Sequence, residues 1–481
     1  MLAQRTFDLD DQRHFARVTG DWNPIHVDEV AARRTMAGSP IVHGIHTLLW
    51  LLESIGSQMP DLPEIARFRV NFGKMLYLGE LAQATVLKQD GKQLRAKVSV
   101  GSVDIMQLIV GFGAARPRSA DVGGGAAAGE VLNPSAPLET TLEAMATQRG
   151  RLAFASDADE IARMFPMAAR MIGPRRVAGL GCSTRLVGMV VPGLHSIFGG
   201  LEVGFTTDED SRSAIDYQVS TVQPELRYVR VEISGGGMLG HVEAFNRPEP
   251  IAQPSVALIR SKVAAAEFEG SIALVVGGSR GLGELVGKIV AAGGGKVVLT
   301  YVAGKADAER VAQDIVEGGG DCHVVPYDVS GDPESQLKSL PAAPSHIYYF
   351  ATPSIFRRKT AAYSPAVFQQ FNVFYVAGFY ALIEQMMRDR EPKDQLSVFY
   401  PSSSALDQRP DNMTEYAMSK AAGEILCQDL DRRMKNLRIL TARLPRILTD
   451  QTASISDVES ADALETLIPL VRDVQRGWKA R

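Results

Sequence analysis

The chain of 481 residues has few cysteines, no long hydrophobic runs and no concentration of charge of one sign. Its three cysteines are far apart and follow no metal-ligand spacing, which excludes a disulfide-stapled scaffold and gives no indication of zinc. The net charge is -4 and no run of five or six Lys or Arg occurs, which argues against a nucleic-acid-binding surface. The apolar runs, such as 48–52, are too short to span a bilayer, and residues 1–11 lack a secretory pattern. We therefore expect a cytoplasmic protein without a metal, nucleic-acid or membrane partner.

Two linker-like stretches divide the chain. Residues 116–139 are rich in Gly, Ala and Pro without apolar periodicity, and a second Pro-dense piece covers 247–255. We predict the following division: a first domain at 1–115, a linker at 116–150, a second domain at 151–248, a linker at 249–268 and a third domain at 269–481.

The first domain contains a compact group of residues suited to proton transfer. Asp21 and His26 stand on either side of an Asn-Pro turn, and Gly44 opens an apolar helix. Adding or removing water across a double bond conjugated to a thioester requires one proton to be taken and another delivered, which an Asp and a His on one turn can do. Gly44 can present a backbone N–H to the developing enolate oxygen.

The order of these residues resembles the MaoC-like, R-specific enoyl-thioester hydratases of the hotdog fold. The resemblance implies that Asp21 and His26 are the acid-base pair and that Gly44 provides the oxyanion contact. His43 and His46 lie beside Gly44, and we interpret them as residues that line or brace the helix.

A weak internal repeat indicates a second, degenerate hotdog domain. Residues 42–47 match 191–196, and 70–72 match 203–205, as in double-hotdog hydratases. The second copy has no counterpart of Asp21 or His26, because 168–189 place Arg and Gly there. We expect this half to shape an acyl pocket and to perform no chemistry.

A second signature lies in the third domain. Residues 271–301 read as strand, glycine-rich turn, helix and strand, the context of a dinucleotide-binding fingerprint. This spacing resembles the short-chain dehydrogenase/reductase family, which implies that the turn and a later Asp bind a dinucleotide. The cofactor-binding residues predicted from it are Gly277, Ser279, Arg280, Gly281, Gly283 and Asp328.

The catalytic residues of that family have counterparts in Ser403, Tyr416 and Lys420. Tyr416 and Lys420 are four residues apart and share a helix face, so we expect the cation to lower the pKa of the phenol. Tyr416 would then protonate a carbonyl oxygen while Ser403 holds it, and Tyr416 and Lys420 would also contact the cofactor. Ser402 and Ser404 are alternatives for the serine.

Cofactor choice depends on the residues after the second strand of this domain. No carboxylate occurs in 300–305, whereas Arg280 in the glycine turn suits a 2'-phosphate. We expect NADPH, with NADH less favoured.

This domain also departs from the family pattern. Residues 349–352 replace the usual Asn-Asn-Ala-Gly, Tyr375 stands three residues before Gly378 where an Asn is usual, and Asn372 lies a turn earlier. Only 35 residues follow Pro445-Arg446, which leads us to expect an acyl site that is open or is completed by the hotdog half or by a partner chain.

Together these patterns predict α+β tandem hotdog domains followed by an α/β Rossmann-type doubly wound parallel sheet. The two resemblances imply a bifunctional 3-oxoacyl-thioester reductase and 3-hydroxyacyl-thioester dehydratase that acts on short acyl chains carried by CoA or acyl carrier protein. Two alternatives remain: hydration and oxidation of enoyl-CoA, or a scaffold that binds acyl groups or nucleotides with one or both sites inactive. By resemblance we expect a homo-oligomer.

Overall fold

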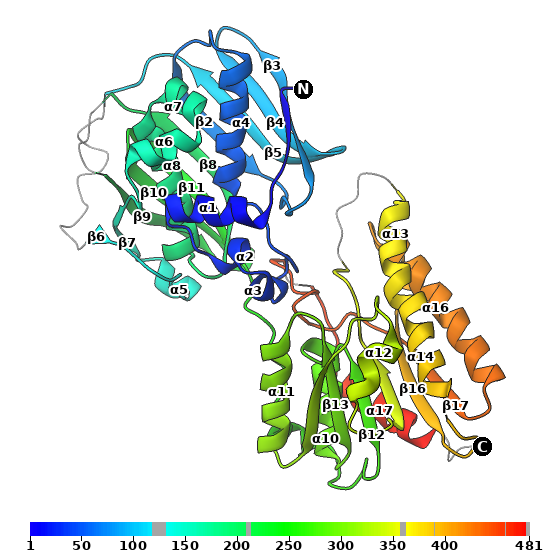
Figure 1. Cartoon of the computed structure of the whole chain (residues 1–481). Helices are drawn as coiled ribbons and strands as arrows, with labels where there is room; N and C mark the ends of the chain where they lie inside the picture. The colour runs from blue at the N-terminus through cyan, green and yellow to red at the C-terminus, as the bar shows by residue number, and fades with distance from the viewer. Residues whose placement is uncertain (118–130, 208–212, 356–361, 389, 457, 478–481) are drawn as a thin grey trace. The chain divides into compact units, whose positions relative to one another are not determined.

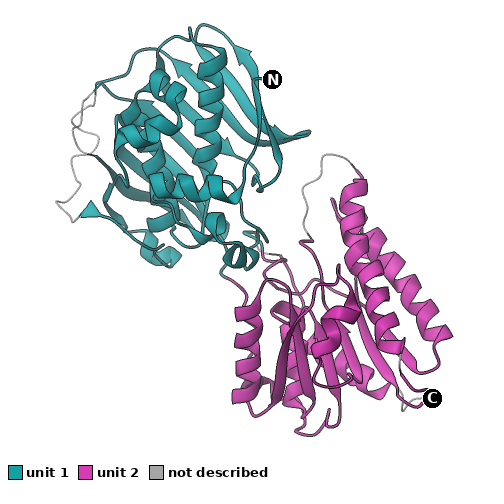
Figure 2. Ribbon diagram, in the orientation of Figure 1, with its two compact units in different colours: residues 1–249, 454–457 teal, residues 250–453, 458–481 magenta. Residues whose placement is uncertain are grey.

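The computed structural model divides into two compact units, Met1–Glu249 with Ser454–Asp457, and Pro250–Ala453 with Val458–Arg481 (Figure 2). It describes residues 1–117, 131–207, 213–355, 362–388, 390–456 and 458–477. The boundary between the units falls in the Pro-dense stretch predicted from the sequence.

The first unit is built on one 11-stranded sheet with the order β1-β3-β4-β5-β2-β8-β11-β10-β9-β7-β6. Counted outward from the central β2–β8 pair, one half has the order β2-β5-β4-β3-β1 and the other has β8-β11-β10-β9-β7. The two halves therefore have the same strand order, apart from the short β6 at the edge. That pair is antiparallel, with Val70 opposite Leu201. The strands are β1 (Ala3–Thr6), β2 (Ile65–Phe72), β3 (Leu81–Gln89), β4 (Gln93–Val100), β5 (Val103–Phe112), β6 (Val131–Leu132), β7 (Arg149–Ala153), β8 (Ser196–Phe205), β9 (Ala214–Gln223), β10 (Tyr228–Gly235) and β11 (Met238–Asn246).

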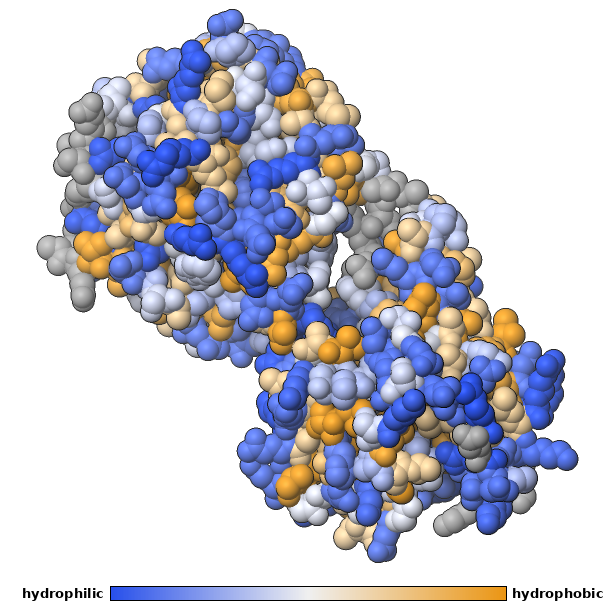
Figure 3. Space-filling view, viewed as in Figure 1, coloured by the Kyte–Doolittle hydropathy of each residue, from blue (hydrophilic) through white to orange (hydrophobic). Residues whose placement is uncertain are grey.

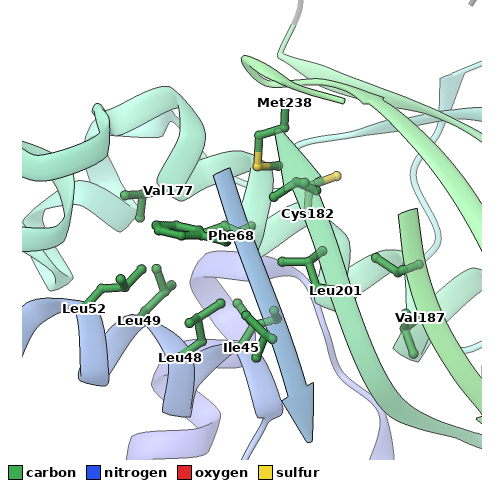
Figure 4. Close-up of a cluster of buried hydrophobic side chains, with 14 of the residues drawn as sticks. Ile45, Leu48, Leu49, Leu52, Phe68, Val177, Cys182, Val187, Leu201 and Met238 are labelled. Carbon is green, nitrogen blue, oxygen red and sulfur yellow. The ribbon is translucent and has the colours of Figure 1, made fainter. Parts of the chain in front are cut away.

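Each half contributes one long helix, α4 (Gly44–Gln58) or α8 (Pro174–Arg185), to a single core (Figures 1 and 4). Residues of α4, β2, β8 and α8 that meet in this core include Leu49, Phe68, Leu201 and Val177. The two halves therefore share one hydrophobic interior. The smaller helices of the unit are α1 (Leu9–Thr19), α2 (Pro24–Val27), α3 (Glu29–Arg33), α5 (Leu142–Met145), α6 (Ala158–Met164), α7 (Pro166–Ile172), the π-helix η1 (Leu186–Val190) and η2 (Pro224–Leu226).

One part of the predicted internal repeat is wrong. Residues 42–47 begin α4, but 191–196 follow α8 and η1 and lead into β8, so the two stretches occupy different places in the fold. The match between 70–72 and 203–205 does fall on equivalent positions, the ends of β2 and β8. Short similarity around a single Gly-x-His was misleading because turns before and after a helix use the same residues.

The stretch assigned to the first linker contains secondary structure. Residues 131–150 include β6, α5 and the start of β7, and β7 pairs with β9. Residues 118–130 of the predicted linker lie outside the described part of the chain. In the second predicted linker, α9 (Val256–Ile259) packs against the second unit's core.

The second unit is a six-stranded parallel sheet with the order β14-β13-β12-β15-β16-β17. This is the strand order of a Rossmann fold, in which ligands bind where the order reverses, here between β12 and β15. Residues of β12 alternate between two hydrophobic clusters, so both faces of the sheet are covered. The strands are β12 (Ile272–Val276), β13 (Lys296–Tyr301), β14 (Asp321–Pro326), β15 (His346–Tyr349), β16 (Leu396–Ser403) and β17 (Leu437–Leu444).

The helices of the second unit are α10 (Gly281–Ala292), α11 (Lys305–Glu317), α12 (Pro333–Gln336), η3 (Leu337–Ser339), α13 (Pro365–Asn372), the π-helix η4 (Val373–Ala377), α14 (Gly378–Arg388), α15 (Ala405–Gln408), α16 (Thr414–Arg433) and α17 (Ala463–Arg476).

One helical stretch differs from the expectation about membrane-spanning segments. Residues Pro365–Arg388 form a continuous helix that is long and apolar enough to cross a membrane by length and composition alone. The sequence reading overlooked it because polar residues such as Asn372 interrupt the apolar run. In the structure this helix directs Phe371, Tyr375 and Phe379 into the buried clusters of the unit.

On the face shown in Figure 3, hydrophobic and hydrophilic residues are interspersed over both units.

The shared core of the first unit makes a stability prediction. Phe68→Ala removes a fully buried ring, and we expect a loss of about 3–5 kcal/mol in unfolding free energy. The measurement is chemical denaturation followed by tryptophan fluorescence, since two of the three tryptophans, Trp22 and Trp50, are in this unit. Leu87→Ala, at a side chain that is 55% exposed, is the control, and a change of equal size there would contradict the prediction.

Candidate functional sites

The turn that carries Asp21 and His26 is fixed by local sequence. Helix α1 ends at Gly20 in the left-handed conformation, φ 75°, which reverses the chain. Asn23 then caps α2, because its side-chain oxygen accepts from the amide of Ile25 at 3.2 Å and Pro24 occupies the first helical position. Asp21 and His26 are thereby held at the two ends of one tight turn.

The carboxyl group of Asp21 is buried yet hydrogen-bonded. Its Oδ2 accepts from the hydroxyl of Thr184 at 2.7 Å and its Oδ1 accepts from the amide of Asn23 at 3.2 Å. Loss of solvent by burial raises the pKa of Asp21 to about 7, although these hydrogen bonds and the charge of Arg185 oppose the rise. Near neutral pH this carboxyl group can therefore hold or release a proton.

His26 has the opposite tendency. Its Nδ1 donates to the carbonyl oxygen of Ile41 at 2.8 Å, because that oxygen can only accept, and so Nε2 presents a lone pair. Burial, with a smaller contribution from the charge of Arg247, lowers the pKa of His26 to about 4, although the hydrogen bond to Ile41 opposes the change. One side-chain nitrogen or oxygen from each of Asp21, His26 and His43 lies within 4.8 Å of the others. A proton donor and a proton acceptor therefore stand side by side.

Gly44 occupies the first position of α4, where backbone N–H groups have no intrahelical partner. A Cβ at Gly44 would lie 3.0 Å from the ring of Phe72, so a larger residue would require that ring to shift. The amide of Gly44 is thus available to an oxygen of a substrate.

The two histidines beside Gly44 are core groups. His43 and His46 are fully buried, and burial lowers the pKa of each well below its usual range. The side-chain oxygen of Gln12 accepts from the amide of His43 at 3.1 Å and lies 2.9 Å from its Nδ1. The ring of His43 stacks on that of His26 with centroids 3.8 Å apart. This geometry agrees with a bracing role, and Gln12 is a buried partner that no sequence pattern had indicated.

In the second unit, the glycine turn lies between β12 and α10. Gly277 and Gly281 have φ values of 79° and 60°, and the amide of Gly277 donates to Thr300 Oγ1 at 3.0 Å. A Cβ at Gly283 would lie 2.3 Å from the carbonyl oxygen of Gly277, so helix and turn can approach only with glycine there. Ser279 is buried within this turn. The first turn of α10 suits a phosphate group.

Arg280 forms an ion pair that the sequence did not predict. Its Nη1 lies 3.4 Å from Asp450 Oδ2, and both side chains are largely buried. The carboxylate group of Asp307 also lies near the glycine turn, although the segment 300–305 contains no carboxylate. A Cβ at Gly304 would lie 3.3 Å from Asp307 Oδ2 and 3.5 Å from Ser279 Oγ. Asp307 was missed because it is in the first turn of α11, which folds back toward the glycine turn.

Asp328 follows β14, at the carboxyl edge of the sheet. Its carboxylate accepts from the amide of Ser330 at 2.9 Å and from its hydroxyl at 2.7 Å. This closes a local turn and holds the carboxylate at the loop after the strand, the position predicted for contact with a cofactor.

Of the three neighbouring serines, the structure brings Ser403 to the tyrosine. Ser403 is the neighbouring side chain that lowers the pKa of Tyr416. Ser402 instead donates to Glu424 at 2.5 Å, and Ser404 precedes the short helix α15. Ser403 is therefore the serine placed to share a substrate oxygen with Tyr416.

The expected effect of Lys420 on Tyr416 is wrong for this structure. Burial raises the pKa of Tyr416, and Ser403 is the group that lowers it. The ammonium group of Lys420 donates to the carbonyl oxygen of Pro401 at 2.6 Å and lies 4.0 Å from the ring centroid of Tyr375. Burial lowers the pKa of Lys420 to about 7. Four-residue spacing put both groups on one helix face but did not fix where the long lysine side chain points.

Two departures from the reductase pattern meet in space. The hydroxyl groups of Tyr375 and Thr352 lie 2.5 Å apart, so a residue of the altered 349–352 segment is paired with the residue that replaces the usual Asn. Tyr375 also packs edge-to-face against Tyr416 with centroids 5.7 Å apart. Asn372 lies one turn earlier, at the end of α13.

Comparison with known proteins agrees with the geometry of the first unit. Residues 2–107 match the model of the MaoC like domain family. The chain carries a MaoC-like dehydratase domain at its N-terminus. It is 33% identical over 86 residues to 3-hydroxybutyryl-CoA dehydratase of Methylorubrum extorquens, covering 18% of this chain and 55% of that protein.

The chain is also similar to reductases. The chain is 35% identical over 82 residues to versicolorin reductase stcU of Emericella nidulans, covering 17% of this chain and 31% of that protein. A structure of 3-oxoacyl (acyl-carrier-protein) reductase from Agrobacterium tumefaciens C58, with NADP bound, aligns with a TM-score of 0.39 and 19% identity over 43% of this chain and 88% of that one. The matched segment spans about a third of the length of the versicolorin reductase.

The glycine turn makes a binding prediction. Gly283→Ala forces the turn and α10 apart, and we expect the affinity for NADPH to fall at least about tenfold, measured by fluorescence titration. Gly477→Ala, where the nearest atom to a Cβ is 3.4 Å away, is the matched control. Equal affinities for the two variants would show that the turn does not hold the dinucleotide.

Proposed function

We propose that the protein is bifunctional, a reductase of 3-oxoacyl thioesters and a dehydratase of the 3-hydroxyacyl thioesters that result. The observation that carries the proposal is an Asp21–His26 pair with opposite proton affinities in one unit and a Ser403–Tyr416 pair beside a dinucleotide turn in the other. The product of the second site is the substrate of the first, and one chain keeps both sites at high effective concentration. The substrate is a short acyl chain on CoA or acyl carrier protein.

The dehydration follows from the proton affinities of the two residues. Nε2 of His26 removes the proton from C2, and the electron pair moves toward the thioester carbonyl, whose oxygen accepts from the amide of Gly44. The protonated carboxyl group of Asp21 gives its proton to the 3-hydroxyl group, which leaves as water while the double bond forms. The first unit, with its two halves of equal strand order, would act as one double-hotdog domain with this single site.

In the reduction, Tyr416 delivers a proton to the carbonyl oxygen at C3 while Ser403 hydrogen-bonds to that oxygen. NADPH, when bound, supplies the hydride. The residues that would hold it are those of the glycine turn, with Asp328, Tyr416 and Lys420 toward the other end. At Gly281 a Cβ would meet only Thr449, at 3.9 Å, so the helix start is open to a phosphate group. NADPH, a cytoplasmic location and pairing into a homo-oligomer remain parts of the proposal.

A second candidate function has one supporting observation. Lys420 is held by the Pro401 carbonyl and by the rings of Tyr375 and Tyr400, at 4.0 and 5.0 Å from the centroids. A lysine retained there would not assist hydride transfer. The second unit would then bind the nucleotide without reducing a substrate, and the chain would act as a dehydratase alone.

The test is incubation of the full chain with acetoacetyl-CoA and NADPH, with the cofactor followed by absorbance and the acyl products by mass spectrometry. We expect crotonyl-CoA from the wild type, and only 3-hydroxybutyryl-CoA from Asp21→Asn, because that variant has no carboxyl group to protonate the leaving hydroxyl. Tyr416→Phe should reduce cofactor consumption by about 100-fold or more. Asp10→Asn and Tyr363→Phe, at exposed side chains, are the controls. Absence of NADPH consumption by the wild type with CoA and carrier-protein substrates, together with normal dehydration, would favour the second candidate.

Arg280 makes a prediction about cofactor choice. Loss of a charge-assisted hydrogen bond to a 2'-phosphate in Arg280→Gln should raise the KM for NADPH about tenfold or more and leave the KM for NADH unchanged. Steady-state kinetics with both cofactors measure this, and Arg433→Gln, at an exposed position on α16, is the control. A wild type that prefers NADH would point instead to a role for Asp307 at the ribose and to the oxidative direction.

A further inference from the structure

The half of the first unit that has no acid-base pair nevertheless contacts the pair in the other half. The region expected to hold such groups, 168–189, forms α7, α8 and η1, and these elements end beside Asp21. Thr184, in the last turn of α8, is 3% exposed and donates to Asp21 Oδ2 at 2.7 Å. Among the described residues, no other side chain donates a hydrogen bond to this carboxyl group.

The π-helix η1, which follows α8, leaves room for the carboxyl group of Asp21. A Cβ at Gly188 would lie 2.1 Å from Asp21 Oδ1, so any larger residue would displace Asp21. The Gly at this position in the second half is therefore required by the first half.

A second contact reaches the His26 end of the turn. Arg247, directly after β11, is 3% exposed, and its Nη2 donates to the carbonyl oxygen of Leu194 at 2.9 Å. The side-chain amide of Asn23, which caps the helix of His26, donates to the same oxygen at 3.3 Å. The guanidinium group is thereby fixed next to the turn that carries the pair.

Arg247 keeps its positive charge without a counter-charge. In the part of the chain that the structure describes, no carboxylate forms an ion pair with it, and its Nε has no hydrogen-bond partner. A buried cation with no carboxylate beside it disfavours a second positive charge nearby. The charge of Arg247 acts on His26, which must stay neutral to accept a proton.

We propose that the second half supplies two positioning residues to the site of the first half: Thr184, which orients and stabilises the carboxylate of Asp21, and Arg247, whose charge adds to burial in disfavouring protonation of His26 at Nε2. This inference rests on the proposed dehydratase function. It assigns electrostatic control of the reaction to the half that was expected only to shape an acyl pocket.

The charged and titratable groups around the pair define the expected effect. Asp21 faces Arg185 on α8 and His43 at the start of α4, while His26 faces His43 and Arg247. The reactive form has a neutral His26 and a protonated Asp21. Dehydration should therefore fall below the pKa of His26 and above that of Asp21.

The test is the pH dependence of kcat/KM for dehydration of 3-hydroxybutyryl-CoA by the full chain. Thr184→Val removes the donor to the carboxylate, raises the pKa of Asp21 and should move the alkaline limb upward by about one pH unit. Arg247→Gln removes the positive charge and should move the acid limb upward instead. Thr184→Ser and Arg247→Lys keep the donor and the charge, and should keep the wild-type limbs.

The control is Ser183→Ala on the same helix. The hydroxyl group of Ser183 donates to the carbonyl oxygen of Leu180 and does not contact Asp21. If Thr184→Val fails to fold, as judged by circular dichroism, Thr184→Ala carries the same expectation. If an active Thr184 or Arg247 variant keeps the wild-type pH limbs, this inference is overturned, while the proposed function is unaffected. A wild type that dehydrates no thioester at any pH would overturn the proposed function and this inference with it.

Discussion

The antiparallel pairing of β2 with β8 is the constraint on which the first unit depends. Because Val70 lies opposite Leu201, the two halves of the sheet continue into each other and their long helices pack on one core. That packing brings the end of α8 to the turn after α1, where Thr184 reaches Asp21. Without the pairing, Asp21 and His26 would lie on a turn without this support, and Asp21 would lose its burial against α8 and its hydrogen bond from Thr184.

The parts of both sites that could be predicted are those fixed over short sequence distances. Three features act through local backbone geometry and could be located from the sequence alone. They are Asn23-Pro24, the glycines of the turn after β12 and the four-residue spacing of Tyr416 and Lys420. Gln12, Thr184 and Arg247 act across long loops or across the β2–β8 junction, and no pattern in one sequence connects them with Asp21 or His26. The order of strands beyond the two signatures was equally invisible, because alternation gives each strand a face but not a neighbour.

The second unit shows a different limit. Its strand order and glycine turn follow from motifs, but the state of its polar groups does not. Lys420 turns to Tyr375 and Pro401, Arg280 pairs with Asp450, and Asp307 returns toward Ser279. Each of these side chains has several rotatable bonds, and the partner that it selects depends on residues distant in sequence. The pairing of Tyr375 with Thr352 brings two departures from the family pattern into direct contact in this chain.

The unequal halves of the first unit have a consequence for stoichiometry. Two identical hotdog subunits would present two copies of every residue. A substitution that changed an acid-base residue or a supporting residue would then change it in both subunits. Here one half holds Asp21 and His26 and the other contributes Thr184, Gly188 and Arg247, so the described part of each chain has one candidate dehydratase site beside one Rossmann-type unit. The ratio of the two sites is thus set by the covalent chain, at one to one, and does not vary with the level of expression.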